Sequence, residues 1–207
     1  MSGQNSPNRG ISIFFVGDSE LSGGVYEGAI LCRGTLRIPG DCRIKGGMRV
    51  EEDLEVMGDL YLEGGGDIKG DVKLWEDLRV KGGMKVEGDI EVRGDAEFLG
   101  GLQVNGDINI RHGCIIKGGI RIGGDILVGD DLEITTRGTE KSGIKGDIIV
   151  HGDAKISGEK ILVIDGNISV DGDLFLENVE ISGDVKASSL KLGENVTING
   201  DIINTES

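Results

Sequence analysis

The chain has 207 residues, of which 38 are glycine and 3% are aromatic, and its formal net charge is −15. This acidic balance argues against nucleic acid as a partner, because phosphates need lysine and arginine. It argues weakly against anionic membranes, so membrane contact stays open. No run of about 18 apolar residues exists, which excludes a membrane-spanning helix. The first ten residues lack the apolar core of a secretory signal, and three cysteines stand at apolar-patterned positions, which together predict a cytoplasmic protein.

The first 29 residues differ in pattern from the rest of the chain. We expect a disordered tail over residues 1–10, because this segment is polar. Residues 11–29 carry the apolar run ISIFFV but miss the six-residue spacing of the following segment. We expect them to form an N-terminal cap or an irregular first coil.

A six-residue repeat runs from Ile30 to Arg137 without interruption, for eighteen hexads. The first and third residues of each hexad are apolar, apart from Gly66 at one first position, and most hexads end in Gly-Asp or Gly-Gly. An apolar period of two, broken by glycine, predicts very short strands joined by tight corners.

A longer period of eighteen residues groups the hexads in threes. Three hexads make one coil with two aspartate corners and one Gly-Gly corner, which predicts an all-β, three-sided parallel β-helix. The Gly-Gly pairs stand at 46–47, 64–65, 82–83, 100–101 and 118–119. The two aspartate series are Asp53, Asp71, Asp89, Asp107 and Asp125, and Asp41, Asp59, Asp77, Asp95 and Asp131.

The frame breaks at residues 135–143, where we expect a surface insertion at a corner. It resumes at Ile144 and continues to Ile202 with the same coil pattern. We therefore predict a single β-helix domain over residues 30–202, with about nine or ten coils and a length of roughly 45 Å. A C-terminal tail is expected over residues 203–207.

Aspartate, histidine and cysteine are the residue types that could carry chemistry. The aspartate columns could hold Ca²⁺, but one carboxylate per corner favours a structural role in which aspartate accepts backbone N–H groups. His112 and His151 could be compared with the histidine bases of left-handed β-helix acyltransferases, but neither adjoins a long excursion that would shape a pocket. Cys32, Cys42 and Cys114 stand at inward positions without metal-ligand spacing, which predicts core packing. We predict no enzyme activity, no catalytic residue, no cofactor and no metal site.

Some apolar residues stand where the pattern predicts a surface. Met57 and Trp75 occupy one outward column in successive coils, and a contiguous apolar stripe of this kind indicates a lateral interface. The last coil contains Val196, Ile198 and Ile202 and is followed only by a short polar segment. Its strand edges are therefore expected to be open and to form an end-to-end contact between copies.

The units VEGDIEVRGD, VNGDINI, IKGDIIV, VDGDLFL and INGDI resemble those of the bactofilin family, over roughly residues 30–202. The resemblance implies a right-handed β-helix that polymerises end to end into nucleotide-independent cytoskeletal filaments. It implies a scaffold whose main partner is the chain itself, with cell-envelope or polar-localisation proteins as further partners. The alternatives are a non-polymerising β-solenoid, such as a fibre segment or a binding module, and, with less support, a left-handed hexapeptide acyltransferase.

Overall fold

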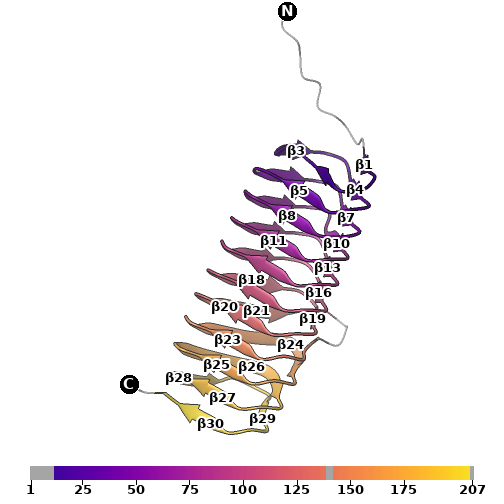
Figure 1. Ribbon diagram of the computed structural model, residues 1–207. Coiled ribbons are helices and arrows are strands. Elements are labelled where there is room, and N and C mark those ends of the chain that lie inside the picture. The colour runs from indigo at the N-terminus through magenta and orange to yellow at the C-terminus, as the bar shows by residue number, and fades with distance from the viewer. Residues whose placement is uncertain (1–11, 139–141, 206–207) are drawn as a thin grey trace, which may run out of the picture.

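The computed structural model describes residues 12–138 and 142–205, which form a rod of stacked coils. The coils follow one another along the rod in chain order, from the N-terminal end to the C-terminal end (Figure 1). All strand pairs within it are parallel, and the described residues contain no helix. The predicted all-β, three-sided parallel β-helix is confirmed. The tail expected over residues 1–10 lies outside the described residues.

Each coil contributes one strand to each of three faces. Face 1 contains β1 (Ile13–Phe15), β4 (Ile30–Cys32), β7 (Met48–Val50), β10 (Gly66–Ile68), β13 (Met84–Val86), β16 (Leu102–Val104), β19 (Ile120–Ile122), β22 (Gly143–Ile144), the second halves of β24 (Ala154–Ile164) and β26 (Asp173–Ile181), and β29 (Val196–Ile198). Face 2 contains β2 (Ser19–Glu20), β5 (Leu36–Ile38), β8 (Leu54–Val56), β11 (Val72–Leu74), β14 (Ile90–Val92), β17 (Ile108–Ile110), β20 (Ile126–Val128), β23 (Ile148–Val150), β25 (Ile168–Val170), β27 (Val185–Ala187) and β30 (Ile202–Asn204). Face 3 contains β3 (Gly24–Tyr26), β6 (Cys42–Ile44), β9 (Leu60–Leu62), β12 (Leu78–Val80), β15 (Ala96–Phe98), β18 (Cys114–Lys117), β21 (Leu132–Thr136), the first halves of β24 and β26, and β28 (Ser189–Leu192).

The coil length is eighteen residues over the regular part of the rod and changes after it. Ile90 pairs with Ile108 and Ile108 with Ile126, which is the eighteen-residue register of the sequence pattern. Ile126 then pairs with Ile148, Ile148 with Ile168, and Ile168 with Val185, so the following coils have 22, 20 and 17 residues. The extra residues lie at the corner between faces 3 and 1.

The segments at both ends of the repeat join the stack as strands. Ile13 pairs with Ile30, so β1 is part of a first coil that is one residue shorter than the regular coils. At the other end, β30 extends to Asn204 and pairs with β27, two residues into the segment for which the sequence indicates a tail. Backbone pairing continues there because it needs no apolar side chain.

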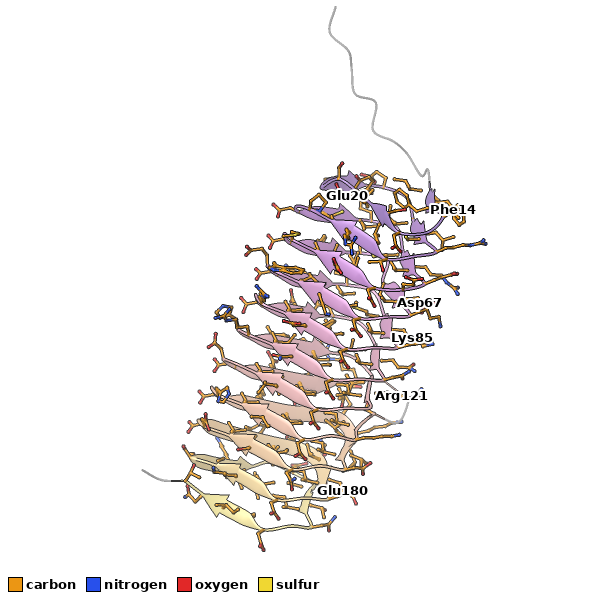
Figure 2. All side chains as sticks on the ribbon, viewed as in Figure 1. Phe14, Glu20, Asp67, Lys85, Arg121 and Glu180 are labelled. Carbon is orange, nitrogen blue, oxygen red and sulfur yellow. The ribbon has the colours of Figure 1, made fainter. Side chains whose placement is uncertain are left out.

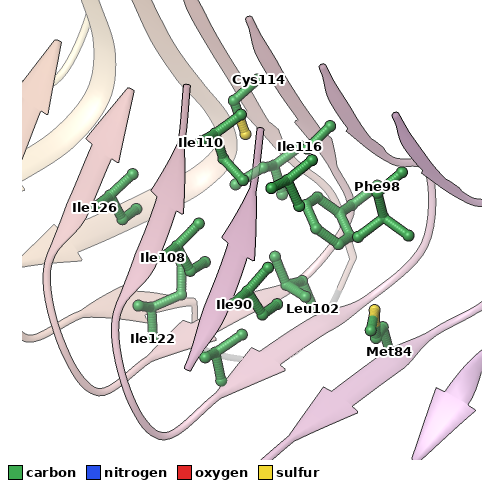
Figure 3. Close-up of a cluster of buried hydrophobic side chains, with 14 of the residues drawn as sticks. Met84, Ile90, Phe98, Leu102, Ile108, Ile110, Cys114, Ile116, Ile122 and Ile126 are labelled. Carbon is green, nitrogen blue, oxygen red and sulfur yellow. The ribbon is translucent and has the colours of Figure 1, made fainter. Parts of the chain in front are cut away.

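One continuous apolar core runs through the rod from Leu21 to Ala187. Most three-residue strands have two buried residues around an outward one, as the hexad pattern predicts. Figure 3 shows how residues of successive coils, among them Met84, Ile90, Phe98 and Ile108, fill the interior between the faces. The predicted core positions of Cys32, Cys42 and Cys114 are confirmed, since all three thiols are free and buried.

The corner between faces 3 and 1 brings backbones so close that a side chain would collide. A Cβ atom at Gly64 would lie 2.5 Å from the carbonyl carbon of Gly46 in the preceding coil. In the last coils, asparagine stands at this corner in place of glycine. Asn178 and Asn195 have φ values of 53° and 52°. Asparagine tolerates this left-handed conformation better than most residues. The Nδ2 atom of Asn195 also donates to Oδ1 of Asn178 at 2.8 Å, which links the two corners.

Candidate functional site

The strand edges at the two ends of the rod are the most unusual surfaces of this molecule. Every internal strand of face 2 pairs on both sides, whereas β30 pairs only with β27 and β2 only with β5 among the described residues. The same holds for β29 and β28, which pair with β26 alone. Each end therefore presents a row of backbone N–H and C=O groups that no strand of the described chain covers. Such edges are templates for pairing with another chain.

The C-terminal end also leaves inward-facing side chains uncovered. Ile202 is 56% exposed and Leu192 is 49% exposed, although their partners one coil earlier, Val185 and Leu176, are fully buried. Val196 and Ile198 pack against the core but are only partly buried. The core column thus continues into the last described coil, and no described strand covers it there. The structure brings together the three residues of the last coil that the sequence indicated.

The N-terminal end also has inward side chains that are only partly buried, although the sequence pattern indicated them less clearly. Ile13, Phe15 and Tyr26 are only partly buried against the core, whereas Leu21 of the same coil is buried. Val25 is 63% exposed because it stands at an outward position, opposite Arg43 of β6. Phe14 points away from the core at this end of the rod (Figure 2) and lies 5.3 Å from the Arg33 guanidinium. The alternation in ISIFFV indicated a strand here. Because this segment does not follow the eighteen-residue spacing, the sequence did not show that the strand pairs with β4.

Met57 and Trp75 lie on the side of the rod, at the corner between faces 2 and 3. Met57 is 56% exposed, and Trp75 stands one coil further along in the same column, half-buried. The Arg93 guanidinium lies 5.2 Å from the Trp75 ring, which is a cation–π contact within the chain. These two residues are separate from the terminal coils, so the five predicted interface residues fall into two groups.

The aspartate columns connect each coil to the next. In the column between faces 1 and 2, Oδ1 of Asp89 accepts the backbone N–H of Asp107 at 2.8 Å, and Asn167 keeps the same contact with Asp184. The column between faces 2 and 3 repeats it, for example from Asp153 to Asp173 at 2.8 Å. These carboxylates therefore satisfy backbone donors at corners, where the sheet hydrogen bonds are interrupted.

The two histidines are exposed and lie beside aspartates, whereas the cysteines are buried. Nδ1 of His112 lies 3.1 Å from Asp130, and Nδ1 of His151 lies 2.8 Å from Asp171, both exposed at the corner between faces 2 and 3. Over residues 12–138 and 142–205, no three His, Cys, Asp or Glu side chains are grouped to hold a metal ion. Burial raises the pKa of the Cys114 thiol to about 12 and that of Cys42 to about 11, so both stay protonated at neutral pH.

Comparison with known proteins gives one match. The family model described as "Bactofilin: Polymer-forming cytoskeletal" matches residues 25–126, which is about half of the chain and covers the most regular coils. No curated protein and no solved structure matches. In the part of the chain that the structure describes, no helix is long and apolar enough to cross a membrane.

Proposed function

Because this chain belongs to the bactofilin family, we propose that it is a structural scaffold whose rods assemble end to end into filaments without nucleotide. The filaments would be cytoskeletal, in keeping with the description of the family. A cytoplasmic location and cell-envelope or polar-localisation partners are further parts of this proposal.

One observation carries the proposal: no described coil covers the core columns at the C-terminal end of the rod. At the C-terminal end, five inward side chains are exposed or partly buried, while their partners in the preceding coil are at most 1% exposed. The five are Leu190, Leu192, Val196, Ile198 and Ile202. A second rod stacked on this end would restore both the core and the strand pairing.

The free energies of burial, hydrogen bonding and association nearly balance, which favours an assembly that depends on concentration. Fully burying one such side chain contributes roughly 1.5–3 kcal/mol, so covering five partly buried ones contributes on the order of 5 kcal/mol. Strand hydrogen bonds add about 1 kcal/mol each. Association itself costs about 4–15 kcal/mol in lost freedom of motion. The net free energy is therefore modest, and the −15 charge on each chain reduces it further at low salt.

The test uses variants of the last coil with a matched control in the middle of the rod. We expect Val196→Lys combined with Ile198→Lys, or Ile202→Pro, to abolish assembly in sedimentation velocity while circular dichroism keeps its β signal. Glu91→Lys, on the outward side of β14, changes the charge at a position away from both ends and should leave assembly nearly unchanged. If the terminal variants assemble as the wild type does, the contact lies elsewhere. Met57→Ser with Trp75→Ser then tests the lateral stripe.

A further inference from the structure

A long groove lies on face 3 and extends to β28 in the last coil. Its volume is about 1020 Å³, and it crosses the strands from β12 to β28. It therefore runs along the rod axis over the outward side chains of successive coils. The floor contains the outward centres of these strands, and one rim is the aspartate corner between faces 2 and 3.

Two apolar side chains stand in the floor of the groove, each between charged neighbours. Ile115 lies between Glu97 and Glu133 in the adjacent coils. Phe175 lies between Lys155 and Lys191 in the same way. Both apolar side chains are half-buried. Three coil steps separate them, which at the spacing of parallel strands is roughly 14 Å.

The rim of the groove is acidic, and most of its aspartates also hold successive coils together. Five aspartates line it, and most of them use Oδ1 to accept an N–H from the next coil, as Asp131 does from Asp153 at 2.8 Å. The other carboxylate oxygen and the charge remain available on the surface. The five are Asp77, Asp95, Asp131, Asp153 and Asp173. The two glutamates are already paired, Glu97 with Arg79 at 2.7 Å and Glu133 with Lys117 at 3.4 Å, so the acidic character of the groove comes from the aspartates. Lys155 and Lys191 flank Phe175, which leaves the rim beside Ile115 the more acidic part.

We propose that this groove binds an extended, cationic segment of a partner protein. In an extended chain, residues i and i+4 lie on one face and about 13 Å apart, which matches the separation of the two apolar side chains. Apolar residues at i and i+4 would cover Ile115 and Phe175. Lysine or arginine around residue i would meet the aspartate rim beside Ile115, at Asp95 and Asp131. This proposal rests on side chains of face 3, and the groove reaches the last coil only at Ser189 and Lys191, so peptide binding does not require end-to-end assembly.

The charge of the rim can be removed without removing the coil contacts. Asn167 already stands in the other aspartate column, and its Oδ1 still accepts the N–H of Asp184 at 2.8 Å. Asp131→Asn with Asp153→Asn therefore changes the charge of the groove and keeps its hydrogen bonds. The matched control is Asp89→Asn with Asp107→Asn, which removes the same charge from the corner between faces 1 and 2.

The probe is the fluorescein-labelled peptide Lys-Leu-Lys-Lys-Ser-Leu-Ser, with Lys-Leu-Lys-Lys-Leu-Ser-Ser as the control of equal composition. The second peptide places its two leucines on opposite faces of an extended chain. In fluorescence anisotropy we expect the groove pair of variants to weaken binding of the first peptide about tenfold and the control pair less than about twofold. Ile115→Ser and Phe175→Ser should each weaken it as well.

Two results would overturn the proposal. If both peptides bind equally and both Asn pairs have the same effect, the attraction is only that of an acidic protein for a cation. If Ile115→Ser, which lies away from the last coil, changes the sedimentation of the chain without peptide, the groove is occupied by a second copy of this chain. Circular dichroism of each variant verifies that the coils stay folded.

Discussion

Oδ1 of Asp89 accepts the backbone N–H of Asp107, 2.8 Å away and one coil further along the rod. The same contact precedes it, from Asp71 to Asp89 at 3.0 Å, and follows it, from Asp107 to Asp125 at 2.8 Å. Each aspartate of this column thus fixes the next coil rather than its own turn. The carboxylates stack at the coil spacing because the backbone donors that they satisfy have that spacing.

We expect replacement of Asp89 to separate its hydrogen bond from its charge. Asp89→Ala removes the acceptor of the Asp107 N–H and should lower stability by about 1 kcal/mol, whereas Asp89→Asn should cost much less. The measurement is the urea midpoint of the β signal in circular dichroism. Equal losses for the two variants would show that charge rather than hydrogen bonding is what this position contributes.

The two glycines of one corner should respond differently to the same substitution. A Cβ at Gly82 would lie 2.5 Å from the backbone nitrogen of Gly65, whereas one at Gly83 would meet nothing nearer than 3.6 Å. Gly82→Ala should destabilise the rod by more than about 2 kcal/mol, because backbone must move. Gly83→Ala should be neutral or should stabilise by about 0.5 kcal/mol, since φ at Gly83 is not in the left-handed region. Thermal melts of both variants decide this, and a Gly82→Ala protein with the melting temperature of the wild type would refute the close stacking.

The regular coils could be predicted from the sequence because one rule repeats in them. Apolar residues such as Ile90 and Val92 alternate with outward ones, and the corner glycines recur at a fixed distance. The hydrogen-bond donor that each aspartate serves was harder to predict. The sequence shows that Asp89 stands at a corner, but only the stacking of coils shows that its acceptor serves Asp107.

The last coils and the ends were harder to predict for physical reasons. Asn178 replaces a glycine pair at its corner, so the glycine signal is missing there although the chain still turns. The exposure of Leu192 depends on the stacking of coils, since no described coil follows it, and not on its own surroundings in the sequence. Trp75 was predicted on the surface, but its contact with Arg93 depends on stacking between coils.

The buried thiols should make stability depend on pH only in alkaline solution. Burial, and then the charge of Asp95, raise the pKa of Cys114 from 9.0 to about 12. The fold therefore favours the protonated thiol: its contribution is complete below pH 9 and is lost as the pH rises towards 12. Cys114→Val lacks this titration, so the difference in urea midpoint between wild type and variant should shrink over that range. Iodoacetamide at pH 8 should leave Cys114 unmodified until urea unfolds the rod, and rapid labelling of the folded protein would contradict its burial.

The most direct measurement of end-to-end assembly is sedimentation velocity with negative-stain microscopy on the wild-type chain, without nucleotide and with EDTA. The series covers about 0.1–10 mg/mL at low and physiological salt, because both mass action and screening of the −15 charge matter. We predict rods that lengthen with concentration and with salt, in steps of about 50 Å, the length of one stack of coils. A single species with the mass of one chain, 21.9 kDa, across the whole series would contradict the account.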